Sequence, residues 1–284
     1  MPELPEVETI ARGLATRVNG DVIESVWLGS KPEPLKSSAR EISKTLEGSR
    51  ILGVRRLGKH IVFDLENPHA RSRAGRKTRR KAEATAHSAQ WIVHLGMTGK
   101  MLVCKPEEEI EKHTHAIAQL ASGRELRFVD PRRFGRLSVT DQFTAPGSEP
   151  LQVELEQFIT LFKGRKTPIK SALLNQKLLS GVGNIYADES LFRAATRPRR
   201  RASSLTLCEL ERLYASVREV LNEAITLGGS SINDYVDADG EEGFFQLQHR
   251  VYGREGEPCL VCQTPIKRIV IAGRSSHYCP HCQN

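Results

Sequence analysis

The 284-residue sequence lacks long apolar runs, and no stretch approaches the ~18 uncharged apolar residues that a membrane-spanning helix needs. Its first residues, MPELPE, are acidic and contain no apolar core, which argues against a signal peptide. These two absences predict that the protein neither spans a membrane nor is secreted. They favour a cytoplasmic, reducing compartment, in which paired cysteines bind metal rather than form disulfides.

Several well-known functional motifs are missing as well. The sequence has no internal repeat, no Walker-type phosphate loop and no Gly-x-Ser-x-Gly elbow. The glycines of GVGN (181–184) lack the strand–turn–helix context of a dinucleotide site. These absences argue against P-loop nucleotide hydrolases, α/β-hydrolases and dinucleotide-binding enzymes.

The composition is that of a globular protein with a modest positive charge. Hydrophobic residues make up 39% of the chain, charged residues 27%, and the formal net charge is +8. Residues 71–81 hold seven basic residues and no acidic one, and residues 193–201 hold five. Clusters of this kind attract phosphates. A solvated loop is the alternative explanation for residues 71–81.

Four of the six cysteines fall in the last 26 residues, as Cys259-x2-Cys262 and Cys279-x2-Cys282. Two Cys-x-x-Cys turns offer four thiolates, the ligand set of a structural zinc ion. The alternatives are four unrelated cysteines or two disulfides. The intervening residues predict a hairpin formed by 263–266 and 269–273, with Arg274 near its tip. Cys104 and Cys208 stand alone, and we expect both to be buried thiols.

The first half of the chain combines one helical segment with many strand-like ones. Residues 7–18 carry Ile10, Leu14 and Val18 at helical spacing. Residues 60–65, 91–95, 101–103 and 126–129 are short strand-like runs separated by turns, a pattern typical of an antiparallel sandwich or barrel. The polar, basic residues 67–89 have few apolar side chains and are expected to form a mobile insertion.

The second half changes to helical periodicity. Apolar residues recur at helical spacing within 151–162 and 205–225. A glycine-broken turn lies between them, and Asn184 stands where a helix would begin. An N-cap role for Asn184 is compatible with phosphate contact, because helix N-termini bind anions. Residues 229–246 are expected to form a long acidic loop.

The N-terminal Met1-Pro2-Glu3 has its own chemistry. Removal of Met1 would leave a secondary amine on Pro2, with a pKa of about 8. Such an amine can attack a carbonyl carbon to give a cationic iminium, and Glu3 would stand next to it to move protons. A proline-rich acidic terminus without any catalytic role is the alternative.

Seven sequence blocks together resemble the formamidopyrimidine-DNA glycosylases, which remove oxidised purines such as 8-oxoguanine. They run in order through nearly the whole chain: PELPEVETIARGL, LGKH, HLGMTGKM, DPRRFGR, SGVGNIYADESLF, QHRVYGREGEPC and GRSSHYCPHCQ. The resemblance implies an α+β multidomain fold. Its expected parts are an N-terminal antiparallel β-sandwich with flanking helices (1–145), a helix–two-turn–helix domain (146–240) and a C-terminal zinc-ribbon β-hairpin (241–284).

The resemblance also implies how the reaction proceeds. Pro2 would attack C1′ of the damaged nucleotide, Glu3 would act as general acid/base, and β- and δ-elimination would cut the strand. Lys59 matches an active-site lysine and Arg274 completes the catalytic set. Glu6 matches a carboxylate near the base pocket, although an acidic first helical turn explains it equally well.

The same resemblance implies a set of DNA contacts. Extruding a base leaves a hole in the duplex, and Met97, Arg132 and Phe134 match the residues that fill it. His94, Arg132, Asn184 and Arg274 match DNA-binding positions. One structural Zn²⁺, held by Cys259, Cys262, Cys279 and Cys282, would fix the hairpin that presents Arg274. The loop 229–246 corresponds to a segment that folds over the extruded base.

The resemblance therefore implies a monomeric, nucleoid-associated repair enzyme of bacterial type that acts on double-stranded DNA containing oxidised purines. Two alternatives remain open. One is a relative of endonuclease VIII, which shares the mechanism but prefers oxidised pyrimidines. The other is a zinc-ribbon DNA-binding protein without catalytic activity.

Overall fold

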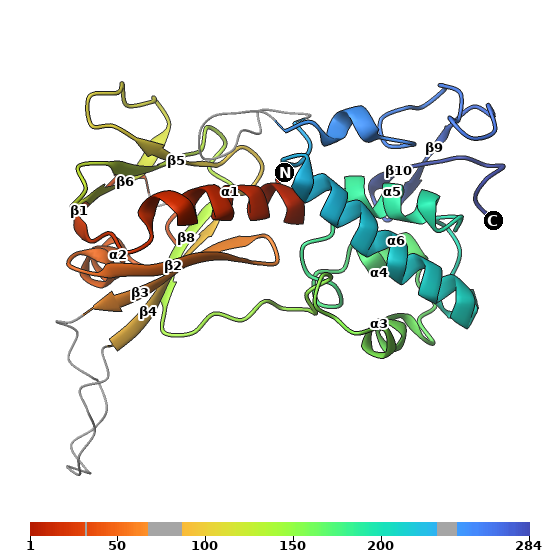
Figure 1. Cartoon of the computed structure of the whole chain (residues 1–284), viewed down its shortest axis with the longest axis horizontal. Coiled ribbons are helices and arrows are strands. Elements are labelled where there is room, and N and C mark those ends of the chain that lie inside the picture. Colours follow the sequence, from red (N-terminus) through yellow and green to blue (C-terminus); the bar gives the residue numbers. More distant parts are fainter. Residues whose placement is uncertain (32, 68–86, 232–242) are drawn as a thin grey trace, which may run out of the picture. The chain divides into compact units, whose positions relative to one another are not determined.

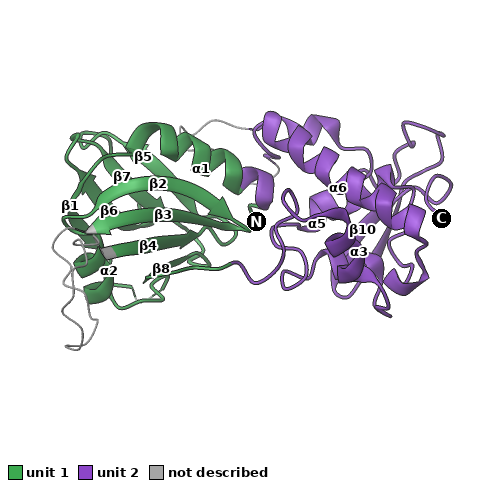
Figure 2. Cartoon of the chain, turned by 60° about the horizontal axis from the view of Figure 1, so that its bottom comes forward, with its two compact units in different colours: residues 1–2, 7–144, 234–242 green, residues 3–6, 145–233, 243–284 purple. Residues whose placement is uncertain are grey.

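The computed structural model describes residues 1–31, 33–67, 87–231 and 243–284 (Figure 1). Most of the predicted basic insertion and of the predicted acidic loop 229–246 therefore lie outside the described residues. The described chain divides into two compact units (Figure 2). The first contains Met1–Pro2 and Val7–Thr144, and the second contains Glu3–Glu6 and the described residues from Ala145 onward.

Two four-stranded antiparallel sheets form the first unit, with strand orders β1-β6-β7-β5 and β2-β3-β4-β8. Both sheets contribute to one apolar core, which α1 and α2 also line. The elements are α1 (Leu4–Val18), β1 (Ile23–Leu28), α2 (Ala39–Leu46), β2 (Arg50–Leu57), β3 (His60–Asn67), β4 (His87–His94), β5 (Lys100–Cys104), β6 (Thr114–Leu120), β7 (Glu125–Val129) and β8 (Arg136–Thr140).

The hydrophobic periodicity explains this packing. Ile10, Leu14 and Val18 of α1 are all at most 1% exposed, so the predicted helical face is the buried one. Alternate residues of β3, from Ile61 to Leu65, point into the same core. The predicted α+β fold with an N-terminal antiparallel sandwich is confirmed, and α1 begins three residues earlier than expected.

The boundaries of the predicted insertion are wrong at both ends. Asn67 is still part of β3, and His87 already belongs to β4, where the two residues face each other in the ladder. The apolar run Trp91–Val93 continues the strand that begins at His87, but the polar residues before it hid the start of the strand from the sequence pattern.

Helices and a terminal hairpin form the second unit, which has its own apolar core. Thr206 caps α6 in a capping box with Glu209. None of the helices in the described parts of the chain has both the length and the apolar character needed to cross a membrane. The elements are α3 (Leu155–Phe162), α4 (Ile169–Leu173), α5 (Asn184–Arg193), η1 (Ala202–Ser204), α6 (Leu207–Thr226), η2 (Phe245–Gln248), β9 (Lys267–Ile271) and β10 (Arg274–Tyr278).

The C-terminal hairpin exists, but its strands differ from those predicted. It consists of β9 and β10, joined at Ala272-Gly273, whose φ values are 47° and 76°. Two consecutive positive φ angles are the mark of a type I′ turn, which matches the twist of paired strands. Residues 263–266 instead run antiparallel to residues 256–259, with a bridge between Pro258 and Pro265 and a hydrogen bond from the N–H of Cys259 to the carbonyl of Thr264.

The two isolated cysteines behave differently from each other. Cys104 in β5 is buried, as expected, whereas Cys208 at the start of α6 is exposed. The expectation for Cys208 was wrong because the apolar face of α6 lies on other positions, including Leu210 and Leu213.

Two glycines of the sandwich provide a test of backbone packing. Gly96 has φ +64°, and a Cβ there would lie 2.5 Å from the amide nitrogen of Gly135. Gly123 has φ +82° but open space around it. We expect Gly123→Ala to cost about 1–2 kcal/mol, the usual penalty of a left-handed residue, and Gly96→Ala to cost at least ~3 kcal/mol because backbone must also move.

Urea unfolding followed by tryptophan fluorescence measures this difference, since Trp27 and Trp91, the only tryptophans, both lie in the first unit. Equal destabilisation by the two substitutions would contradict the close approach at Gly96.

Candidate functional site

The predicted residues of the first unit gather at one end of the sheet β2-β3-β4-β8. Leu57, His60, His94 and Arg136 follow one another across the four strands as ladder partners. Lys59 occupies the two-residue turn between β2 and β3, after Gly58 with φ 58°. The sheet end therefore combines ammonium, imidazole and guanidinium groups in a single row.

His94 is held as a neutral side chain. Burial lowers its pKa to about 4, and the charges of His60, Arg136 and Lys59 act in the same direction. The N–H of Gly96 donates to His94 Nδ1 at 3.0 Å. Because Nδ1 accepts, the single proton of the neutral ring resides on Nε2. His94 can thus donate a hydrogen bond to an anion without carrying a charge.

Two loops beside this row present the predicted void-filling residues. Met97 lies in the loop after β4, and Arg132 and Phe134 lie in the loop before β8. Met97 is 40% and Phe134 52% exposed, so neither serves the core. The Arg132 guanidinium lies 5.0 Å from the centre of the Phe134 ring, a cation–π distance.

A fully buried carboxylate ties the two loops together. Asp130 accepts hydrogen bonds from the hydroxyl of Thr98 at 2.6 Å and from the N–H of Gly135 at 2.7 Å. Its Oδ1 also accepts from the N–H of Arg132 at 3.3 Å. Asp130 thereby fixes both loops, and the three exposed side chains are brought to neighbouring turns.

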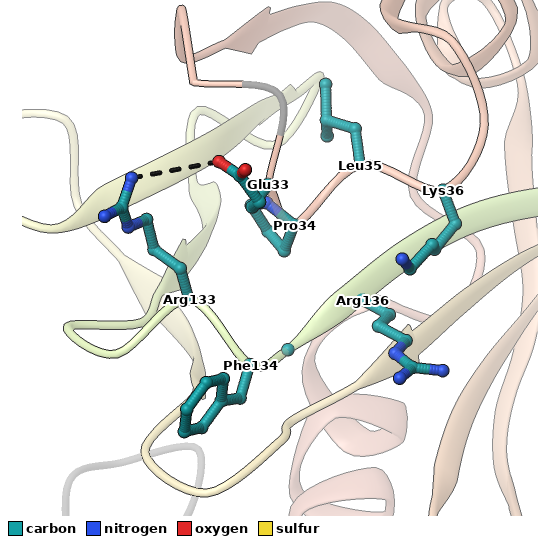
Figure 3. A pocket seen from close by; sticks show the side chains of 8 residues that line it. Glu33, Pro34, Leu35, Lys36, Arg133, Phe134 and Arg136 are labelled. Atoms are coloured by element: carbon teal, nitrogen blue, oxygen red, sulfur yellow. Dashed lines mark ion pairs between the residues drawn. The ribbon is translucent and has the colours of Figure 1, made fainter.

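A hollow of about 220 Å³ adjoins Phe134, lined by residues 33–36 and 133–136 (Figure 3). Glu33 forms an exposed ion pair with Arg133 at 3.8 Å. Lys36 and Arg136 both line this hollow, and main-chain hydrogen bonds join the 34–36 segment to Leu137 of β8. Within the described residues, no carboxylate pairs with either of these two cations, so the hollow has a net positive lining.

In the second unit, two predicted carboxylates are buried at the start of α1, Glu3 just before the helix and Glu6 in its first turn. Glu3 and Glu6 are 5% and 2% exposed. Glu6 Oε2 accepts the N–H of Glu3 at 2.7 Å, and Oε1 accepts the N–H of Ser230 at 2.8 Å and the hydroxyl of Tyr186. The described contacts of Glu6 therefore fix Glu3 and the chain after α6.

Glu3 packs against the start of α5. Its Oε1 accepts the N–H of Ile185 at 3.3 Å. A Cβ at Gly183 would lie 2.2 Å from the Glu3 carboxyl carbon, so only glycine leaves room for this carboxylate. Gly183 is also the N-cap of α5, and Asn184 is the first helical residue rather than the cap. The Asn184 amide instead donates to the hydroxyl of Ser275, next to Arg274, at 3.2 Å.

The four predicted metal ligands form one cluster. The sulfurs of Cys259, Cys262, Cys279 and Cys282 all lie within 4.8 Å of one another. Separations of 3.4 Å (Cys262–Cys279) and 3.9 Å (Cys259–Cys282) are far longer than a disulfide and close to the ~3.8 Å edge of a tetrahedron with Zn–S of about 2.3 Å. Hydrogen bonds from Thr264 lower the pKa of Cys262 to about 6, whereas burial raises the pKa of Cys279 and of Cys282, so the geometry of the sulfurs rather than their acidity identifies the site. The cluster fits one zinc ion.

The sequence interpretation missed several residues that build these sites. Asp130 and Gly183 lie inside the quoted blocks DPRRFGR and SGVGNIYADESLF, but their supporting roles depend on contacts distant in sequence. Lys36 gave no signal, because it lies in an ordinary-looking stretch, KPEPLK. Of the five arginines in 193–201, Arg193 pairs with Glu223, Arg200 pairs with Glu209, and Arg197 donates to main-chain carbonyls, so this cluster is largely structural.

Exposed apolar side chains beside cations, together with a zinc hairpin, are features of proteins that bind and distort nucleic acids. Comparison with known families agrees with this class. The model of the formamidopyrimidine-DNA glycosylase N-terminal domain matches residues 1–137, and that of the formamidopyrimidine-DNA glycosylase H2TH domain matches residues 146–236. A third, for the zinc finger found in FPG and IleRS, matches residues 256–284.

Individual relatives cover the whole chain. Formamidopyrimidine-DNA glycosylase of Solibacter usitatus is 44% identical over 293 residues, which is 100% of this chain and 99% of that protein. The enzyme of Listeria monocytogenes is 39% identical with complete coverage of both. The chain belongs to the formamidopyrimidine-DNA glycosylase family.

Solved structures give the same result. The MutM (Fpg) protein of Thermus thermophilus is 41% identical with a TM-score of 0.82, covering 99% of this chain and 98% of that one. A variant of the Lactococcus lactis protein in complex with Fapy-dG-containing DNA is 32% identical with a TM-score of 0.85 and covers both chains completely. The predicted family and fold class are both confirmed.

The protonation state of His94 can be measured directly. NMR titration should give a pKa of about 4 with the proton on Nε2, and Arg136→Gln should raise that pKa because one of the charges lowering it is removed. The native state thus resists protonation between pH 6.5 and 4, so the stabilising contribution of neutral His94 is full above pH 6.5 and is lost as the pH falls. A titration near 6.5, or an Nδ1–H tautomer, would contradict the structure.

Proposed function

We propose that this chain is a bifunctional DNA glycosylase and abasic-site lyase that removes oxidised purines from duplex DNA. The glycosylase activity is supported by the relatives, which carry that name. The observation that carries the reaction chemistry is the buried hydrogen bond from the N–H of Glu3 to Glu6. It restrains the peptide group that follows Pro2, whose nitrogen becomes an amine once Met1 is removed.

The reaction uses this amine twice. The nitrogen of Pro2 forms a bond to C1′ while the bond from C1′ to the base breaks, and the base leaves with a proton. The product is an aminal, whose nitrogen gives up its proton. Protonation of O4′ then breaks the C1′–O4′ bond and opens the sugar ring, which leaves an iminium between Pro2 and C1′. This iminium is an electron sink, so loss of a C2′ proton expels the 3′ phosphate, and a second elimination expels the 5′ phosphate. Glu3 moves protons in these steps, and Lys59 stabilises negative charge near the phosphate.

The DNA contacts follow from the exposed groups. Met97 and Phe134 fill the space left by the extruded base, and Arg132 hydrogen-bonds the orphaned partner. His94, Asn184 and Arg274 bind phosphates, with Arg274 suited to bidentate contact. The four sulfurs leave zinc no open coordination position, so the metal has a structural role.

The substrate is a damaged duplex. Lactococcus lactis relatives bound to DNA containing Fapy-dG, an abasic site or an oxidised pyrimidine support this choice. The PELPEVE start and the GRSSHYCPHCQ ending favour purine lesions. Action as a monomer, a nucleoid location, a base-pocket role for Glu6 and the division into parts 1–145, 146–240 and 241–284 complete the proposal.

Borohydride trapping tests the mechanism. Processed wild-type protein should form a covalent adduct on 8-oxoguanine duplex, and peptide mapping should locate the link at Pro2. Trapping should fall partly in Pro2→Gly, which retains a primary amine, and completely in a form that retains Met1, because an amide nitrogen cannot attack.

The same assay separates the alternatives. Faster trapping on thymine glycol than on 8-oxoguanine would indicate the endonuclease VIII-like activity. Duplex binding by processed wild-type protein with no adduct on either lesion would mean a non-catalytic DNA-binding protein.

A further inference from the structure

A buried ion pair lies beside the hairpin that carries Arg274. Lys170 of α4 and Asp188 of α5 are both 0% exposed, and their Nζ and Oδ1 atoms lie 2.7 Å apart. Burial lowers the pKa of Lys170, and the Asp188 carboxylate opposes that shift. Two charges removed from water are tolerated only when further hydrogen bonds satisfy them. The other hydrogen-bond partners of Lys170 and Asp188 therefore show which segment the ion pair holds in place.

Both members of the pair bond to the outer edge of β10. Lys170 Nζ donates to the carbonyl of Ser275 at 2.5 Å, and Asp188 Oδ2 accepts the N–H of His277 at 2.9 Å. These residues are two apart, so their main-chain groups point to the same side of the strand. The hairpin has only two strands, and the ion pair satisfies edge groups of β10 that a third strand would otherwise bond.

The zinc cluster and the ion pair hold different parts of the hairpin. Cys279 follows directly after Tyr278, so the metal fixes the end of β10 that lies away from the turn. Lys170 bonds one residue beyond Arg274, which opens β10 at the turn. Its ammonium lies within electrostatic range of both Arg274 and Glu3. The hydroxyl of Ser275 also accepts the Asn184 amide.

From this arrangement we infer that Lys170 is a positioning residue, which together with Asp188 sets Arg274 in place to grip a DNA phosphate. Zinc alone does not achieve this placement. The inference rests on the proposed function only in taking duplex DNA as the ligand. It requires no contact of Lys170 with the substrate.

The test compares Arg274→Ala, the double variant Lys170→Met/Asp188→Asn and the triple variant. The asparagine introduced by Asp188→Asn keeps an oxygen that can accept the N–H of His277, so the double variant leaves no lone buried charge and removes chiefly the bond to Ser275. The probe is a duplex containing a tetrahydrofuran abasic-site analogue, with affinity measured by fluorescence anisotropy at several salt concentrations.

We expect the double variant to lose about tenfold in affinity or more, as for loss of a charge-assisted phosphate contact. The slope of the logarithm of the binding constant against the logarithm of the salt concentration should become shallower by ~0.9, because one phosphate contact is lost. The triple variant should bind no worse than Arg274→Ala, because the two changes act through the same contact. Each variant should retain one zinc per chain.

Gln283→Leu is the matched control in the same tail. Gln283 is 0% exposed and bonds the N–H of Cys279 and the carbonyl of Thr196, at the zinc end of the hairpin. If Gln283→Leu lowers the affinity, its fold-loss should multiply with that of Arg274→Ala when the two are combined, because the two residues act independently. Wild-type affinity in the zinc-loaded double variant, or effects of the double variant that multiply with Arg274→Ala, would overturn the inference.

The proposed catalytic function is assessed separately. If the wild type gives no borohydride adduct, the catalytic proposal is wrong. The affinities of the variants for duplex DNA would still test the role of Lys170. Absence of any duplex binding by the wild type would overturn both.

Discussion

The carboxylate of Glu6, buried in the first turn of α1, organises the candidate catalytic end of the chain. A carboxylate removed from water is costly unless hydrogen bonds replace its hydration. Glu6 receives them from the N–H groups of Glu3 and Ser230 and from the Tyr186 hydroxyl. Hydrogen bonds to a charged acceptor contribute about 1.5–3 kcal/mol each, so moving Glu3 away from this position is energetically unfavourable.

Buried carboxylates also hold other segments of the chain through hydrogen bonds from main-chain N–H groups. Asp130 joins the loops of Met97 and Phe134. Asp188 and Lys170 hold the edge of β10, and Glu189 accepts three consecutive N–H groups, from Arg250 to Tyr252. Each carboxylate sits on or beside a regular element and accepts from the backbone of the segment it holds. Because the backbone of these segments is fixed from below, their functional side chains can stay exposed to solvent without becoming mobile.

Periodicity and motif spacing predicted much of this molecule. Local patterns predicted the buried face of α1, the strands with alternating apolar residues and the four-cysteine cluster. Each of these features depends on the spacing of residues that are close together in the sequence. The hairpin strands were misplaced, since Ala272 in a type I′ turn gives no compositional signal of the kind that Asn-Gly would give. Gly183 was not identified as the N-cap because its role comes from the approach of Glu3, which is far away in sequence.

The supporting carboxylates were harder to predict for the same reason. A buried Asp or Glu cannot be distinguished from an exposed one without its partners, and those of Glu6 lie as far away as Ser230. The candidate catalytic and DNA-binding roles came from the resemblance to a family, whereas the contacts that position these residues came from the structure.

Single-turnover excision of 8-oxoguanine by Glu6→Gln tests the central role of this carboxylate most directly. Glutamine keeps an oxygen for Tyr186 and Ser230 but presents an amide group to the N–H of Glu3. If the buried acceptor orients the Pro2–Glu3 peptide, the excision rate should fall about 100-fold, with zinc content and duplex affinity retained. An unchanged rate in a folded, zinc-loaded variant would contradict the account.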